Sequence, residues 1–136
     1  MHKYDREPDK IHLDETHLGN VTRYNHMGQL IQTIPHSDVS HSPFQCPRYI
    51  TENNNGDVVV SDCDSVVVTS SEGTYGFSYT GPASKSGFFP GVICTDSFSN
   101  ILVCDLSTST VHMLNKDGQF LSVLLTHKSP GIQKCL

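Results

Sequence analysis

The stretch LNKDGQF, residues 114–120, shares its Asn, Gly and Gln with YNHMGQL at residues 24–30. Between them, SSEGTY at residues 70–75 places its glycine in the matching position. The three turn glycines stand at intervals of 45 residues: Gly28, Gly73 and Gly118. A turn that returns at a fixed period indicates a chain built from structural repeats.

The residues around these turns keep the same register. Three valines also follow the 45-residue period: Val21, Val66 and Val111. Earlier in the units an offset of 43 pairs Asp62 with Asp105. The change from 43 to 45 places a two-residue insertion in the third unit, within the loop DLSTST at residues 105–110.

Each unit consists of short segments rich in Val, Ile, Thr, Tyr and Phe, joined by turns of Asn, Asp and Gly. The expected strands are 10–13, 20–25 and 29–34, then 48–51, 57–62, 65–70 and 74–80, then 91–95, 100–105, 110–115 and 119–126. The second strand of the later units is continuously apolar, which predicts burial on both faces. Apolar residues show no helical period, so almost no helix is expected.

Four antiparallel strands recurring about every 45 residues are typical of a β-propeller blade. We expect an all-β partial propeller of about three blades, whereas closed propellers have about 4–8. The expected segments are a disordered N-terminus (1–8), an incomplete first blade (9–42), a second blade (43–86), a third blade (87–126) and a tail or the beginning of a missing blade (127–136). The chain is then either a piece of a longer propeller, which we favour, or it self-associates through open blade edges.

Composition and charge exclude several classes of protein. The formal net charge of −5 disfavours a protein whose main role is to bind nucleic acid. No apolar run reaches the roughly 18 residues of a membrane span, and residues 1–10 lack the apolar segment of a secretory signal. A cytoplasmic protein is expected.

The cysteines predict no covalent or metal framework. There are five, an odd number, and no pair has C-x-x-C spacing, so neither a disulfide framework nor a zinc knuckle is expected. Cys94 and Cys104 lie in apolar segments and are expected to be small buried hydrophobic residues.

The third unit resembles the NHL-type propeller repeats of tripartite-motif (TRIM) proteins. The resemblance rests on Pro90-x-x-Ile93 followed by ILVCD and TVHMLNKDGQF, with similar patterns in PRYITENNNGDVVVSD and GNVTRYNHMGQL, and it covers roughly residues 10–126. Members of that family are E3 ubiquitin ligases whose RING and B-box precede a coiled coil. This chain has no such Cys/His ladder and no heptads. The resemblance therefore implies the recognition role of the propeller, with a protein partner or ubiquitination substrate, and not the ligase chemistry.

The expected binding face combines the loops after the second strands with the linkers between blades. Aromatic residues and Arg dominate binding hot spots. The candidate partner-binding residues are Arg48, Tyr49, Asp64, Lys85, Phe88 and Ser107. Asp62 and Asp105 end equivalent strands and are expected to bind backbone N–H groups of the turns, and Phe89 is expected to pack between blades.

Two other functions are weighed against this one. RNA binding would need a basic face with stacking aromatics, which the acidic charge disfavours. A propeller enzyme would need metal-ligating carboxylates or histidines on the inner strands, and RYIT (48–51) and GVICT (91–95) offer none. His36, His41 and Asp38 share one loop, but histidine pairs in loops are usually solvated. No catalytic residue, cofactor or metal is expected.

Overall fold

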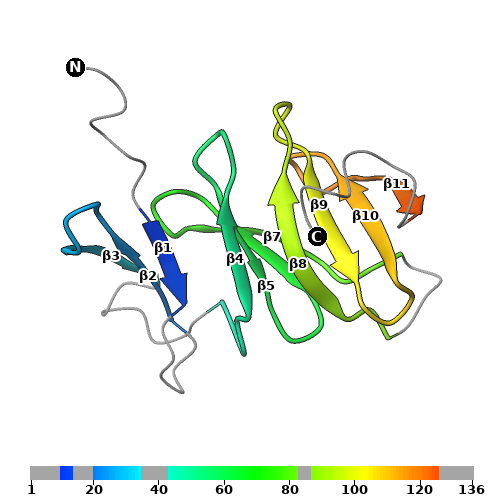
Figure 1. Ribbon diagram of the computed structural model, residues 1–136, viewed down its shortest axis with the longest axis horizontal. Coiled ribbons are helices and arrows are strands. Elements are labelled where there is room, and N and C mark those ends of the chain that lie inside the picture. Colours follow the sequence, from blue (N-terminus) through cyan, green and yellow to red (C-terminus); the bar gives the residue numbers. More distant parts are fainter. Residues whose placement is uncertain (1–9, 14–19, 35–42, 83–86, 126–136) are drawn as a thin grey trace.

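Eleven strands form three antiparallel sheets that stand side by side along the long axis of the molecule (Figure 1). The computed structural model describes residues 10–13, 20–34, 43–82 and 87–125. The strands are β1 (Lys10–Leu13), β2 (Val21–Tyr24), β3 (Leu30–Ile34), β4 (Tyr49–Glu52), β5 (Val58–Ser61), β6 (Val66–Thr69), β7 (Tyr75–Tyr79), β8 (Pro90–Thr95), β9 (Ile101–Asp105), β10 (Thr110–Leu114) and β11 (Phe120–Leu125).

Each sheet is one unit of the repeat. The orders β1-β2-β3, β4-β5-β6-β7 and β8-β9-β10-β11 follow the chain, so every pairing within a sheet is between sequence neighbours. β4 packs against both β1 and β8, which joins the three sheets in series. The all-β partial propeller with an incomplete first blade is confirmed, and the sheets fall within the expected segments 9–42, 43–86 and 87–126. Residues 1–8 and 127–136 lie outside the described residues.

The repeated turn has one hydrogen-bond pattern. The backbone N–H of Asn25, Ser70 or Asn115 donates to the carbonyl four residues later, and the turn glycine donates back, at 2.8 to 3.0 Å. The side-chain oxygen of the same first residue accepts two further N–H groups. The φ angles of Gly28, Gly73 and Gly118 are 80°, 93° and 91°. Only glycine enters this region without steric cost, and a short polar residue supplies the acceptor.

The core lies between the sheets. Alternate residues of the second strand point to opposite faces, so β5 and β9 are buried on both sides. The seam between the first and second sheets contains Val21, Ile34, Phe44, Val58, Val60 and Val67. The seam between the second and third contains Val59, Val66, Val68, Tyr79, Phe88, Ile93, Ile101, Val103 and Leu114. Packing between neighbouring blades on both faces explains the apolar run of β5, as expected. On β9 one face packs in the seam, and Leu102 and Cys104 on the other face pack within the third sheet.

Within the part of the chain that the structure describes, no helix could cross a membrane.

Candidate functional site: the linker face

One side of the molecule gathers the linkers that enter blades and the turns that follow the second strands. We call it the linker face and define it by residues 43–48, 62–65, 87–89 and 106–109. Asp62 accepts the backbone N–H groups of Gln45 and Cys46 at 2.8 and 2.6 Å. One blade later, Asp105 accepts that of Phe89 at 3.2 Å. These N–H groups of the linkers have no partner in a neighbouring strand, so the carboxylates of Asp62 and Asp105 accept their hydrogen bonds.

The two aspartates therefore hold linkers as well as turns. Burial alone would raise the pKa of the Asp105 carboxyl. The pKa is nevertheless held below its ordinary value of 3.8, because the carboxylate accepts hydrogen bonds from the Ser107 hydroxyl, from the backbone N–H groups of Phe89 and Ser107, and from the Thr108 hydroxyl. Asp105 is 1% exposed and Asp62 is 3% exposed. Their role as acceptors for backbone N–H groups is as expected, although both of the N–H groups bonded to Asp62 belong to the linker.

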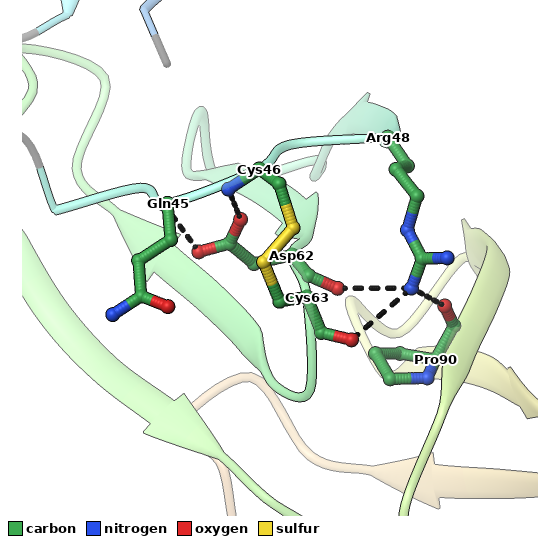
Figure 2. Close-up of a disulfide and its surroundings, with 6 residues drawn as sticks. All are labelled: Gln45, Cys46, Arg48, Asp62, Cys63 and Pro90. Atoms are coloured by element: carbon green, nitrogen blue, oxygen red, sulfur yellow. Dashed lines mark hydrogen bonds between the residues drawn. A yellow bond between two sulfur atoms is a disulfide. The ribbon is translucent and has the colours of Figure 1, made fainter. Parts of the chain in front are cut away.

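Arg48 ties the second blade to the third (Figure 2). Its Nη2 donates to the carbonyls of Asp62, Cys63 and Pro90 at 3.2 to 3.3 Å. Its guanidinium carbon lies 4.3 Å from the centre of the Phe89 ring, a cation–π contact. The same side chain thus orders the turn after β5, the beginning of β8 and an aromatic ring at the surface.

A disulfide also lies on this face, contrary to the expectation from the sequence. Cys46 of the linker bonds to Cys63 of the turn, with 5.3 Å between their Cα atoms (Figure 2). Their separation of 17 residues gave no signal, because only folding brings the linker back onto the turn. Cys94 is disulfide-bonded too, so its assignment as a simple buried hydrophobic residue was wrong. Cys104 is free and buried, as expected.

The linker face exposes large apolar side chains near Arg48 as well as polar ones such as Asp64 and Ser107. Phe89 is 42% exposed, Tyr49 at the beginning of β4 is 42% exposed, and Leu106 is 50% exposed. The N–H of Leu106 donates to the Phe89 carbonyl at 2.8 Å, which places these two residues together. Arg48, Tyr49, Phe89 and Leu106 are called the linker patch below.

Of the two adjacent linker phenylalanines, Phe88 is buried and Phe89 is exposed, the reverse of what was expected. Phe88 is 7% exposed and packs in the seam, edge-on to Tyr79 with ring centres 5.2 Å apart. It does not present its ring to a partner, and Phe89, which was expected between the blades, does. Alternate residues of an extended linker point in opposite directions, and sequence alone cannot tell which of two adjacent phenylalanines faces inward.

The other candidate residues have different positions. Asp64 is exposed at the tip of the turn after β5, on the linker face. Ser107 is exposed, but its hydroxyl donates to Asp105 at 2.7 Å and orders the turn. Lys85 lies outside the described residues, as do His36, Asp38 and His41.

A buried polar chain crosses the seam beneath the linker face. The Tyr79 hydroxyl lies 2.9 Å from Nδ1 of His112, whose Nε2 lies 3.6 Å from the Asp105 carboxylate. Burial, with a smaller contribution from the charge of Asp105, raises the pKa of Tyr79 to about 12. All three side chains are at most 7% exposed, so the chain joins two blades and gives a substrate no access. The sequence pattern did not predict this chain of buried polar residues.

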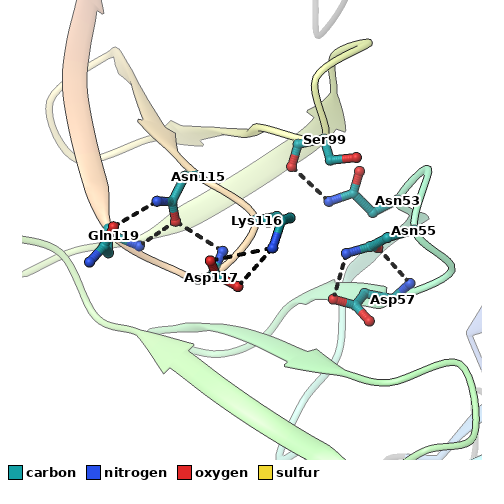
Figure 3. Close-up of polar contacts among 8 residues, drawn as sticks. All are labelled: Asn53, Asn55, Asp57, Ser99, Asn115, Lys116, Asp117 and Gln119. Carbon is teal, nitrogen blue, oxygen red and sulfur yellow. Dashed lines mark hydrogen bonds and ion pairs between the residues drawn. The ribbon is translucent and has the colours of Figure 1, made fainter.

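The opposite side of the molecule, formed by the repeated turns, carries many polar contacts (Figure 3) and also exposes Met27 and Phe98. Asn53 donates to the Ser99 carbonyl at 2.9 Å and links neighbouring blades. An open pocket of about 330 Å³ lies beside it, between Asp57, Lys116 and Asp117. Lys116 pairs with Asp117 at 3.3 Å, so the carboxylate of Asp57 leaves the pocket with a net negative charge.

Comparisons with known proteins bear on the fold. No family model matches the sequence, and no curated protein matches it. A protein of unknown function from Bacteroides caccae superposes with a TM-score of 0.61 at 16% identity, over 86% of this chain and 40% of its own. Streptogramin B lyase superposes with a TM-score of 0.55 at 19% identity, over 85% of this chain and 40% of its own.

These similarities support a propeller-like architecture and show the fold alone. The chain spans about 40% of the length of either structure. The residues of the linker patch must therefore carry the argument for function.

Proposed function

We propose that this chain is a protein-interaction module that recognises its partner through the linker patch. The observation that carries the proposal is the exposed Phe89 ring, which contacts the fixed Arg48 guanidinium and lies beside the exposed Leu106; Tyr49, next to Arg48 in the chain, is exposed as well. Aromatic residues and Arg are enriched at binding hot spots, where they bury a large area at a small cost in side-chain entropy.

The patch is preorganised for binding. The three carbonyls bonded to Nη2 hold Arg48, and the aspartate-bound linkers hold the backbone beneath it. Surface residues that are ordered before binding lose little conformational freedom when a partner arrives. A protein partner that offers an apolar residue beside a carboxylate or carbonyl group matches this composition.

The finer proposal is that the parent protein is a ubiquitin ligase of the TRIM type and that the partner is its substrate. The resemblance of residues 10–126 to NHL-type repeats is what supports this. A cytoplasmic location belongs to the same proposal.

Photo-crosslinking tests the proposal. A photoreactive phenylalanine analogue is placed at Phe89, and the control carries it at Phe98, which is 81% exposed in the turn between β8 and β9 on the opposite side. We expect defined protein adducts from cell extract at position 89 and not at position 98. Adducts to RNA at position 89 would favour RNA binding instead, and protein adducts confined to position 98 would contradict the assignment of the linker patch.

A further inference from the structure

Three metal-ligating side chains converge beside the linker patch. The sulfurs of Cys46 and Cys63 and a carboxylate oxygen of Asp62 all lie within 4.8 Å of one another. They come from two separate segments, the linker before β4 and the turn after β5. Figure 2 shows the Asp62 carboxylate next to the disulfide.

The disulfide lies where soluble thiols can reach it. Cys46 is exposed and Cys63 is half-buried. Non-covalent contacts hold the same two segments together: Asp62 accepts two linker N–H groups, and Arg48 donates to the Asp62 and Cys63 carbonyls. Opening the disulfide would therefore leave both thiols near Asp62.

Two thiols and a carboxylate in this arrangement are zinc ligands. Disulfides are rare in the reducing cytosol, where paired cysteines more often bind metal or act in catalysis. Zn²⁺ accepts thiolate sulfur at about 2.3 Å and carboxylate oxygen at about 2.0–2.2 Å in tetrahedral geometry. Each oxygen of Asp62 accepts one N–H group, and a carboxylate offers about four lone-pair positions, so about one on each oxygen remains for a metal.

We propose that Cys46, Cys63 and Asp62 form a redox-gated Zn²⁺ site. A cellular dithiol reduces the disulfide: two electrons and two protons pass to the two sulfurs, and the reductant becomes a disulfide. Zn²⁺ then binds both sulfurs as thiolates and two protons leave to solvent. The three protein ligands leave a fourth position for water. In the reverse direction a disulfide oxidant takes two electrons from the two thiolates and becomes a dithiol, the Cys46–Cys63 bond re-forms, and Zn²⁺ is released.

The third blade provides an internal contrast. The offset of 43 that pairs Asp62 with Asp105 also pairs Cys46 with Phe89 and Cys63 with Leu106. The third blade keeps the aspartate and the linker N–H bond but has apolar residues at both thiol positions. The fold of a blade therefore does not require cysteines at these positions. Of the second and third blades, only the second combines two cysteines with the aspartate.

Zinc titration of the 136-residue chain, in a reduced and an oxidised sample, tests the proposal by competition with a chromogenic chelator. We expect the reduced protein to bind one Zn²⁺ that the oxidised protein does not bind. Reduction also opens the disulfide of Cys94, so reduced Cys46→Ser, which keeps the Cys94 thiol, should lose this Zn²⁺. Asp62→Asn should weaken binding at least tenfold, and the control Asp64→Asn, in the same turn but exposed, should not. Equal binding by the reduced and oxidised samples would overturn the proposal.

A second readout needs no variant. Zn²⁺ should protect Cys46 and Cys63 of the reduced wild-type chain from alkylation, measured for each cysteine by mass spectrometry. Cys104, which is buried and free, reports whether Zn²⁺ changes the fold as a whole. Unchanged alkylation of Cys46 and Cys63 at saturating Zn²⁺ would also overturn the site.

Discussion

At the scale of single residues, the three turn glycines are needed for different reasons. All three adopt positive φ, but their surroundings differ. A Cβ atom at Gly28 would meet nothing within 4 Å, whereas one at Gly118 would lie 2.6 Å from the ring of Phe77 in the neighbouring blade. The first glycine is needed for backbone conformation alone. The last also lets two blades approach each other.

Replacing these glycines by alanine should separate the two effects. Gly28→Ala should lower the free energy of unfolding by about 1–2 kcal/mol, the cost of a left-handed residue that has a Cβ. Gly118→Ala should lower it by about 2–5 kcal/mol, because overpacking against Phe77 adds about 1–3 kcal/mol to the same backbone cost. Urea unfolding of both variants measures the difference. Equal losses would show that Phe77 does not pack against the third blade as described.

At the scale of elements, strands and turns were predictable and the contacts between linkers and turns were not. The period of 45 fixed the strands because each unit repeats the same turn chemistry and the same apolar second strand. The Cys46–Cys63 bond and the inward position of Phe88 depend on how a linker folds back onto a turn. In the sequence only Cys63 adjoins Asp62, whereas Cys46 lies 16 residues from it, so the repeat alignment does not predict the bond.

The polar chain in the seam was missed for a related reason. The 45-residue offset pairs His112 with Val67 and Tyr79 with Ile34, so the repeat predicts apolar residues at these places. The first seam does contain Ile34 and Val67, packed with Phe44. In the second seam a tyrosine and a histidine replace them, and only the fold shows that they meet.

The seam makes a prediction about pH. The folded-state pKa of Tyr79 is about 12, above the ordinary value of 10.0, so the folded chain favours the protonated phenol. This stabilisation is fully present below pH 10 and is lost as pH rises through about 12, with a total of about 3 kcal/mol. Tyr79→Phe should remove this loss, so its free energy of unfolding should fall less steeply above pH 10 than that of the wild type.

Urea unfolding at a series of pH values from neutral to alkaline measures both slopes. The variant should also be less stable by about 1–2 kcal/mol at neutral pH, because His112 Nδ1 loses its tyrosine partner. Tyr75→Phe is the matched control, since Tyr75 is 55% exposed. Parallel slopes for the wild type and Tyr79→Phe would contradict the buried, protonated state of Tyr79.

At the scale of the whole molecule, three sheets in series form an open arc of a propeller with two unlike sides. The turn side is rich in polar contacts although it also exposes Met27 and Phe98, and the linker side exposes Phe89 and Leu106 beside a guanidinium that is fixed in place. A propeller presents the same side of every blade to a partner, so a binding surface on the linkers extends naturally over several blades. We therefore expect the protein partner to be recognised on the linker side.

The most direct test is the affinity of the crosslinked protein partner for two variants of the same type, Phe89→Ala on the linker side and Phe98→Ala on the turn side. Both must first show unchanged thermal unfolding. We expect Phe89→Ala to weaken binding of the partner by about tenfold or more, as is typical of a hot-spot residue. Phe98→Ala should change the affinity by less than about twofold. Full affinity with Phe89→Ala, together with a loss with Phe98→Ala, would contradict this expectation.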